Sequence, residues 1–214
     1  MAETVQDAVA MNRLIHKAVR RDLGRFDAAL GAFNAGDRER ATALADLFAR
    51  FDEMVTVHHV GEDTHLWPVL SGTPDGRVAV AELSAEHEQI VRSLAAAQAA
   101  VTRLGSTASG PDAVAARSAV GELSHDAETH FVHEERDIED LMSQAEPSSL
   151  QSAFRRLDRE GGFVQGLWFM QWVADGTTSA ERAFLKRAVP APFRWLSARF
   201  AQRKYAHARA AAVG

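Results

Sequence analysis

The chain has 214 residues, of which 46% are hydrophobic and 25% charged, so it suits one or two globular domains with a real core. It has no cysteine, which excludes disulfides, zinc–thiolate sites, haem–thiolate sites and iron–sulfur clusters. The net charge of −5 is unevenly spread, because residues 1–146 carry a net −12 and residues 147–214 a net +7. We expect the basic C-terminal part to dock on the acidic remainder. No aromatic-and-basic motif accompanies it, so we expect no nucleic-acid partner.

The N-terminal stretch MAETVQDAVAMNRL lacks the basic region and apolar run of a signal peptide. No stretch reaches the roughly 18 uninterrupted apolar residues of a transmembrane helix. We therefore expect a cytoplasmic protein that makes no membrane contact and is a monomer or a homodimer.

Clusters of helix-breaking residues divide the first two thirds of the chain. They are Asn-Ala-Gly-Asp at 34–37, SGTPDG at 71–76, GSTASGPD at 105–112 and EPSS at 146–149. The segments between them are rich in Ala, Leu, Arg and Glu, with apolar residues three and four positions apart, which is typical of helices. Four long helices with short connections predict an all-α, antiparallel up-down four-helix bundle over residues 1–146.

The C-terminal extension, residues 147–214, differs in character. Residues 148–175 and 179–208 are predicted to form two further helices, the second broken at Pro190 and Pro192. We expect the aromatic-rich stripe of this extension to pack on the bundle. The stripe comprises Trp168, Phe169, Met170, Trp172, Phe193 and Trp195.

Polar residues interrupt the apolar stripe of every bundle helix near its middle. A buried carboxylate is costly unless it is paired or binds a metal, and six such interruptions on four facing stripes exceed what structural hydrogen bonding explains. A metal site in the bundle core would supply the missing partner, held by His and carboxylate ligands that favour zinc, iron, manganese or copper. The six residues are His16, His58, Glu62, His87, His130 and Glu134.

The spacing of these residues repeats along the chain. His58 and Glu62 are four residues apart, as are His130 and Glu134, so each pair lies on one helix face. The two pairs are 72 residues apart, and each follows a helix that carries a single histidine. Two copies of a helix pair predict a symmetric site with room for two metals, each carboxylate able to bridge them.

The pattern H…HxxxE…H…HxxxE resembles the hemerythrin-like family, the HHE cation-binding domain, over residues 1 to about 143. The strings HHVGEDTHLWPVL and HFVHEERDIEDLM are similar to that family's two HxxxE helices, although the second lacks the usual proline. The resemblance implies a non-haem centre of two iron ions, oxo- or hydroxo-bridged, that handles dioxygen, nitric oxide or hydrogen peroxide. It makes the four histidines terminal ligands and the two glutamates bridging ligands, with peroxidase-like, catalase-like or oxidase activity as a possible consequence.

The sequence departs from the oxygen-carrying hemerythrins at one position. Those proteins carry a second histidine four residues after the one on the third helix, where this chain has Val91. Each metal would then lack about one ligand of six. A centre open on both metals suits binding of peroxide or nitric oxide, or redox turnover, better than simple oxygen carriage.

Several further polar residues lie near the predicted ligands. Asp63 and Glu135 each follow a predicted bridging glutamate and are expected to accept a hydrogen bond from a ligand histidine of a neighbouring helix. His59 lies about 100° around its helix from His58 and is predicted to lie behind the ligands or at the surface. Three more residues are predicted to orient ligands or to form a polar layer beside the metals: Asn12, His65 and Asp137.

Three alternative sites or functions also use residues of this pattern. A ferritin-like site would use Glu62 with His65 and Glu122 with His125, but these pairs are 60 residues apart and do not follow the 72-residue repeat. A zinc hydrolase is disfavoured because the chain has no HExxH motif. An iron-dependent sensor or storage protein that acts through the C-terminal extension stays open.

Overall fold

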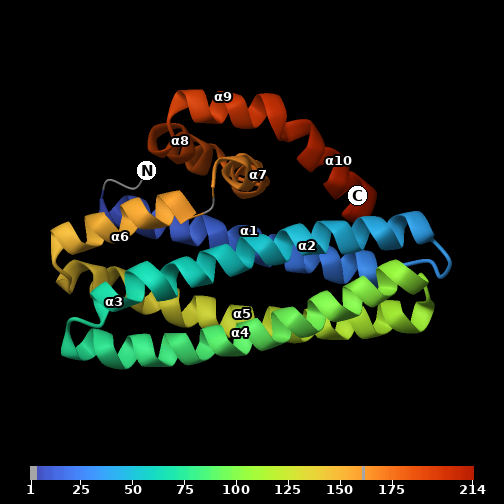
Figure 1. Cartoon of the computed structure of the whole chain (residues 1–214), viewed down its shortest axis with the longest axis horizontal. Helices are drawn as coiled ribbons and strands as arrows, with labels where there is room; N and C mark the ends of the chain where they lie inside the picture. The colour runs from blue at the N-terminus through green and yellow to red at the C-terminus, as the bar shows by residue number, and fades with distance from the viewer. Residues whose placement is uncertain (1–3, 161) are drawn as a thin grey trace.

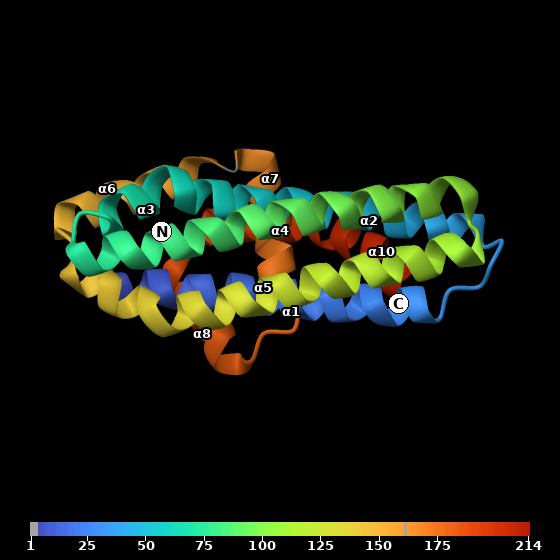
Figure 2. The same cartoon turned by 90° about the horizontal axis from the view of Figure 1, so that it is seen from below.

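Four long helices form the body of the molecule in the computed structural model, which describes residues 4–160 and 162–214. They are α1 (Val5–Gly31), α2 (Arg38–Gly61), α4 (Pro74–Thr107) and α5 (Gly110–Gln144). They run alternately up and down beside one another (Figure 1), and the turned view shows the same arrangement (Figure 2). The predicted all-α antiparallel bundle is therefore confirmed.

The helix ends lie where the breaker clusters predicted them. The side chains of Asp37, Thr73 and Ser109 each accept a hydrogen bond from a backbone N–H three residues on, which caps α2, α4 and α5. Pro74 and Pro111 lie in the first turns of α4 and α5, where a missing N–H costs nothing. Short capped connections hold the four helices antiparallel.

The end of α2 differs from the corresponding part of α5. After Gly61 the chain forms one π-helical turn, η1 (Glu62–Leu66), followed by α3 (Trp67–Leu70). The N–H of Trp67 donates to the carbonyl of Glu62, five residues back. Pro68 has no N–H and its ring cannot lie against the carbonyl four residues earlier, which favours a widened turn here. Helix α5, which corresponds to α2 in the repeat, has no proline at the equivalent position and stays α-helical throughout.

The extension forms more helices than predicted. It contains α6 (Pro147–Glu160), α7 (Phe163–Ala174), α8 (Ser179–Ala188), α9 (Ala191–Phe200) and α10 (Gln202–Val213). The prediction of one helix over residues 148–175 is wrong, because Gly162 lies between α6 and α7 with φ of +63°, a conformation that favours glycine. The predicted break at Pro190 is present, but the one at Pro192 is not, because Pro192 lies in the first turn of α9, where its missing N–H costs nothing. The chain breaks again at Ala201.

The extension covers the side of the bundle formed by α1 and α2, opposite α4 and α5 (Figure 1). The indole N–H of Trp172 donates to Asp22 Oδ2 over 2.8 Å, which joins α7 to α1. Asp175 accepts from Arg25 over 2.6 Å and from the Tyr205 hydroxyl over 2.9 Å. In the Arg25–Asp175 contact the cation belongs to the bundle, whose net charge is negative, and the acid to the extension, whose net charge is positive. This contact is therefore the reverse of the docking expected from the net charges. None of the described helices has the length and apolarity needed to cross a membrane.

We predict that Asp175→Asn destabilises the protein by about 1–3 kcal/mol at pH 7, because it removes charge-assisted hydrogen bonds. Burial alone would raise the pKa of Asp175, but the hydrogen bonds from Arg25 and Tyr205 hold it below its ordinary value. Since the folded pKa is the lower one, this stabilisation is present above the unfolded pKa of about 3.9 and is lost as the pH falls. Urea unfolding at pH 7 and pH 3 checks this. The exposed Asp140→Asn is the control, and a difference that persists undiminished at pH 3 would contradict the prediction.

Candidate metal centre

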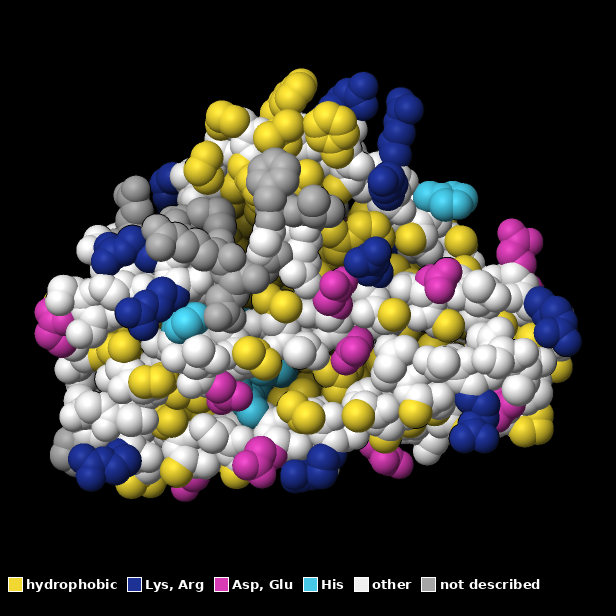
Figure 3. Space-filling view, viewed as in Figure 1, with side chains coloured by type: hydrophobic (Ala, Val, Ile, Leu, Met, Phe, Trp, Pro, Cys, Tyr) yellow, Lys and Arg dark blue, Asp and Glu magenta, His cyan; other side chains and the backbone are white. Residues whose placement is uncertain are grey.

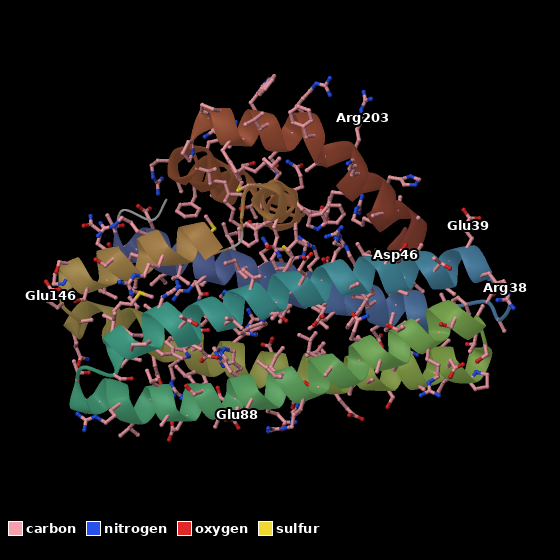
Figure 4. The ribbon with its side chains drawn as sticks, viewed as in Figure 1. Arg38, Glu39, Asp46, Glu88, Glu146 and Arg203 are labelled. Carbon is pink, nitrogen blue, oxygen red and sulfur yellow. The ribbon has the colours of Figure 1, made fainter. Side chains whose placement is uncertain are left out.

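The four histidines singled out in the sequence meet in two pairs near mid-length of the bundle. His16 of α1 and His58 of α2 approach to 3.2 Å between their Nε2 atoms. His87 of α4 and His130 of α5 approach to 3.0 Å between theirs. Space-filling Figure 3 shows histidine side chains between the bundle helices, whereas Glu88, the neighbour of His87, projects outward (Figure 4).

The two glutamates connect the two histidine pairs. Glu134 Oε2 lies 3.2 Å from His16 Nε2 and 3.3 Å from His130 Nε2. Glu62 Oε1 lies 3.6 Å from His58 Nε2, and its Oε2 lies 3.7 Å from His87 Nε2. Each carboxylate therefore reaches both pairs, which is the arrangement a bridging ligand requires.

Carboxylates outside the cluster fix the orientation of three of the four rings. The Nδ1 atoms of His16, His87 and His130 lie 2.9, 3.0 and 3.1 Å from oxygens of Glu135, Asp63 and Glu86, in that order. An ionised carboxylate can only accept, so each Nδ1 donates its hydrogen, and each ring presents its Nε2 to the interior of the cluster. The Nε2 atoms of His87 and His130 thus face each other, where both could bind a cation.

Buried atoms of the cluster lack partners within the described residues. Glu62 Oε2 and Glu134 Oε2 are buried and accept no hydrogen bond. Buried polar atoms in proteins are nearly always hydrogen-bonded, so these two oxygens point to a partner other than the protein. Imidazole nitrogens and carboxylate oxygens are suitable ligands for iron, manganese or zinc, so the residues fit a metal cation.

The pKa values of the two glutamates are shifted in opposite directions. Burial, and then the charge of Glu134, raises the pKa of Glu62 well above its ordinary value. Burial also acts to raise the pKa of Glu134, but His130 and His16 outweigh it and hold this pKa well below the ordinary value. Burial, followed by the nearby His16, lowers the pKa of His58 well below its ordinary value. The cluster therefore favours neutral imidazole at His58, the form that binds metals.

His59 belongs to the cluster, contrary to the sequence-based expectation. Its side chain is 4% exposed, and its ring centroid lies 4.4 Å from that of His87. One potential ligand atom from each of four residues lies within 4.8 Å of all the others: His59, Glu62, His87 and His130. Its Nε2 is buried and has no hydrogen-bond partner in the described part of the chain. Burial, and then the nearby His87, lowers the pKa of His59 well below its ordinary value.

The packing of α2 explains why His59 was missed. One side of α2 packs against α4 and another against helices of the extension, so a residue 100° away from His58 is still inside the molecule. The repeat itself held a signal, because His59 aligns with Phe131, which is fully buried and stacks on His16 at 3.9 Å. Val91 is 60% exposed, so a histidine there would not face the cluster as His59 does.

The remaining predicted residues divide into two groups. Asn12 lies at the cluster, where its Nδ2 donates to Glu134 Oε1 over 2.9 Å. The expected layer of His65 with Asp137 is not formed, because Asp137 contacts Arg136 over 2.6 Å and His133 over 3.5 Å. His65 lies half-buried on η1, beside two fully buried neighbours, Leu66 and Trp67, that take the interior positions. Glu86, which was not singled out in the sequence, lies between His130 and His133.

Fold and site together define a helical-bundle protein with a buried cation-binding cluster of histidines and glutamates. The family model of the hemerythrin HHE cation-binding domain matches residues 7–142, well over half of the chain, and the chain belongs to this family. No curated protein and no solved structure matches the chain at the significance required.

We predict that Asp63→Ala and Glu135→Ala each weaken metal binding by about 10–100-fold, because each leaves a ligand histidine free to rotate. Competition with a chelator of known affinity measures the change. Glu139→Ala is the control, since Glu139 is an exposed acid of α5 that lies outside the cluster. Unchanged affinity in both variants would show that these acids do not orient the metal ligands.

Proposed function

We propose that the protein is a non-haem di-iron protein that binds or reacts with dioxygen, nitric oxide or hydrogen peroxide. The observation that supports this most is the pairing of four inward-facing Nε2 atoms, with two buried carboxylates that each reach both pairs. One iron would be held by His16 and His58 and the other by His87 and His130. Glu62 and Glu134 would each be a ligand of both irons. Iron in such a site supplies Lewis acidity and one-electron redox chemistry.

His59 makes the proposed centre asymmetric. The Nε2 of His59 is buried and has no hydrogen-bond partner among the described residues. His59 would therefore be a third histidine ligand of the iron that His87 and His130 hold. The half made by His16 and His58 would keep two. The sequence alone suggested an open position on both metals, whereas the geometry favours one open position, on the His16 and His58 side. Among the candidate histidine ligands, His58 is the one that lies in the wall of the cavity beneath the extension, together with Glu62.

The protein's own groups would hold the ligands and control protons around the site. Asn12 fixes one oxygen of Glu134, and the outer acids fix the rings of three histidines. Phe131 lies flat on His16, and its apolar face helps to exclude water from that side. These contacts preorganise the site before any ligand arrives.

The main test is the metal content of purified protein, together with its visible spectrum before and after azide, nitric oxide and hydrogen peroxide. We expect two irons per chain, oxo-to-iron absorption in the visible range, and a spectral change with at least one of the three reagents. A colourless protein that contains zinc alone, or one iron per chain, would overturn the proposal. Steady peroxide turnover would favour an enzyme, and ligand-dependent changes in partner binding without turnover would favour a sensor.

A second prediction concerns His59. His59→Phe places at this position the residue that its repeat partner Phe131 has, so the core can stay filled. We expect the variant to fold, to retain one tightly bound iron and to bind the other at least tenfold more weakly in a chelator titration. The exposed His125→Phe is the matched control on α5. Two equally tight irons in His59→Phe would exclude His59 as a ligand.

A further inference from the structure

A cavity of about 600 Å³ lies between the bundle and the extension. Its walls come from α1, α2, η1 and the end of α5 on one side and from α6, α7 and α8 with the start of α9 on the other. At about 30 Å³ per water molecule, this volume far exceeds what dioxygen, nitric oxide or peroxide needs, and it suits a molecule of roughly twenty non-hydrogen atoms.

The composition of the walls indicates a ligand site. Four of the chain's five methionines line the cavity: Met11, Met54, Met142 and Met170. Methionine side chains are flexible and polarisable, and proteins use them on surfaces that adapt to apolar ligands.

Three polar side chains in the wall of the cavity lie at the candidate metal centre. Asn12, His58 and Glu62 all line it, and all three belong to or contact the cluster. A molecule that fills the cavity would therefore have one end beside the half of the centre that keeps an open position. The rest of the molecule would lie against methionine and phenylalanine side chains.

The described walls of the cavity offer no cation to a bound anion. Asp7 and the carboxyl group of Glu62 line the cavity, and no Lys or Arg does so among the described lining residues. Asp7 is 3.1 Å from Arg187, whose side chain is 69% exposed, so this cation lies toward solvent and is already paired. Among the described residues, a carboxylate or sulfonate buried in the cavity would find no lysine or arginine partner, and a buried unpaired charge is costly.

We propose that this cavity binds a neutral, apolar organic molecule with one end against His58, Asn12 and Glu62. The proposal that the cavity binds a ligand depends only on the residues that line it. The role of its occupant at the metal centre rests on the proposed function. The extension would thus distinguish this chain from a bundle that handles only diatomic gases, because α6 to α9 form the second wall of the cavity.

The test uses the full chain and two fluorescent probes that differ by one charge. N-phenyl-1-naphthylamine is neutral, and 1-anilinonaphthalene-8-sulfonate is the same molecule with a sulfonate. We expect the neutral probe to bind metal-free protein saturably, one per chain, at least tenfold more tightly than the sulfonate. Equal or tighter binding of the sulfonate, or binding without saturation, would overturn the proposal.

Cavity-filling variants locate the bound probe. Ala188→Phe on α8 and Ala8→Phe on α1 fill the cavity from opposite walls and should each weaken binding of the neutral probe at least tenfold. Ala183→Phe is the matched control, since Ala183 is exposed on α8 and does not line the cavity. Circular dichroism verifies folding, and two walls keep the test valid if one variant is unstable. Unchanged affinity in both folded variants would overturn the proposal.

Measurements on iron-loaded protein distinguish the proposed ligand cavity from the proposed di-iron function. If the probe lies beside the centre, it should shift the visible spectrum of the parent and leave that of Ala188→Phe unchanged. A protein that takes up no iron but binds the probe as described would overturn the proposed function and support the cavity. A spectrum that never responds to a bound probe would overturn the placement of the ligand end at His58.

Discussion

Two fully buried carboxylates and an inward-facing set of imidazoles occupy the middle of the bundle, and the rest of the structure is arranged around their requirements. Without a cation, Glu62 Oε2 and Glu134 Oε2 are unsatisfied, and the Nε2 atoms of His87 and His130 lie 3.0 Å apart. An apolar core of the same volume would avoid these costs. Acids behind the cluster, such as Asp63 and Glu135, hold the rings so that their Nε2 atoms point inward rather than into the helix interfaces. The bundle is thus built to stabilise bound positive charge.

Helix geometry made much of this site predictable from the sequence. The four-residue spacing of His58 with Glu62, and of His130 with Glu134, can only place each pair on one helix face. Because the apolar stripes of the four helices face one another, the polar residues within these stripes were expected to lie together in the core. The 72-residue repeat also indicated which helices pair, so the bundle and its six central side chains followed from local rules and symmetry.

The parts that were not predicted depend on packing between distant segments. His59 is interior because α2 is covered on two sides, which a single-helix pattern cannot reveal. The widened turn at η1 breaks the repeat, and the buried Leu66 and Trp67 there leave His65 at the margin. The division of the extension at Gly162 is a backbone property of one residue, and the cavity exists because two groups of helices meet over it.

The central claim concerns two cations in two distinguishable positions, and anomalous diffraction at the iron edge from iron-loaded crystals tests it directly. Two anomalous peaks are expected in the bundle core, one among His16, His58 and the two glutamates and the other next to His59, His87 and His130. A single peak, or a second peak with no contact to His59, would contradict the account.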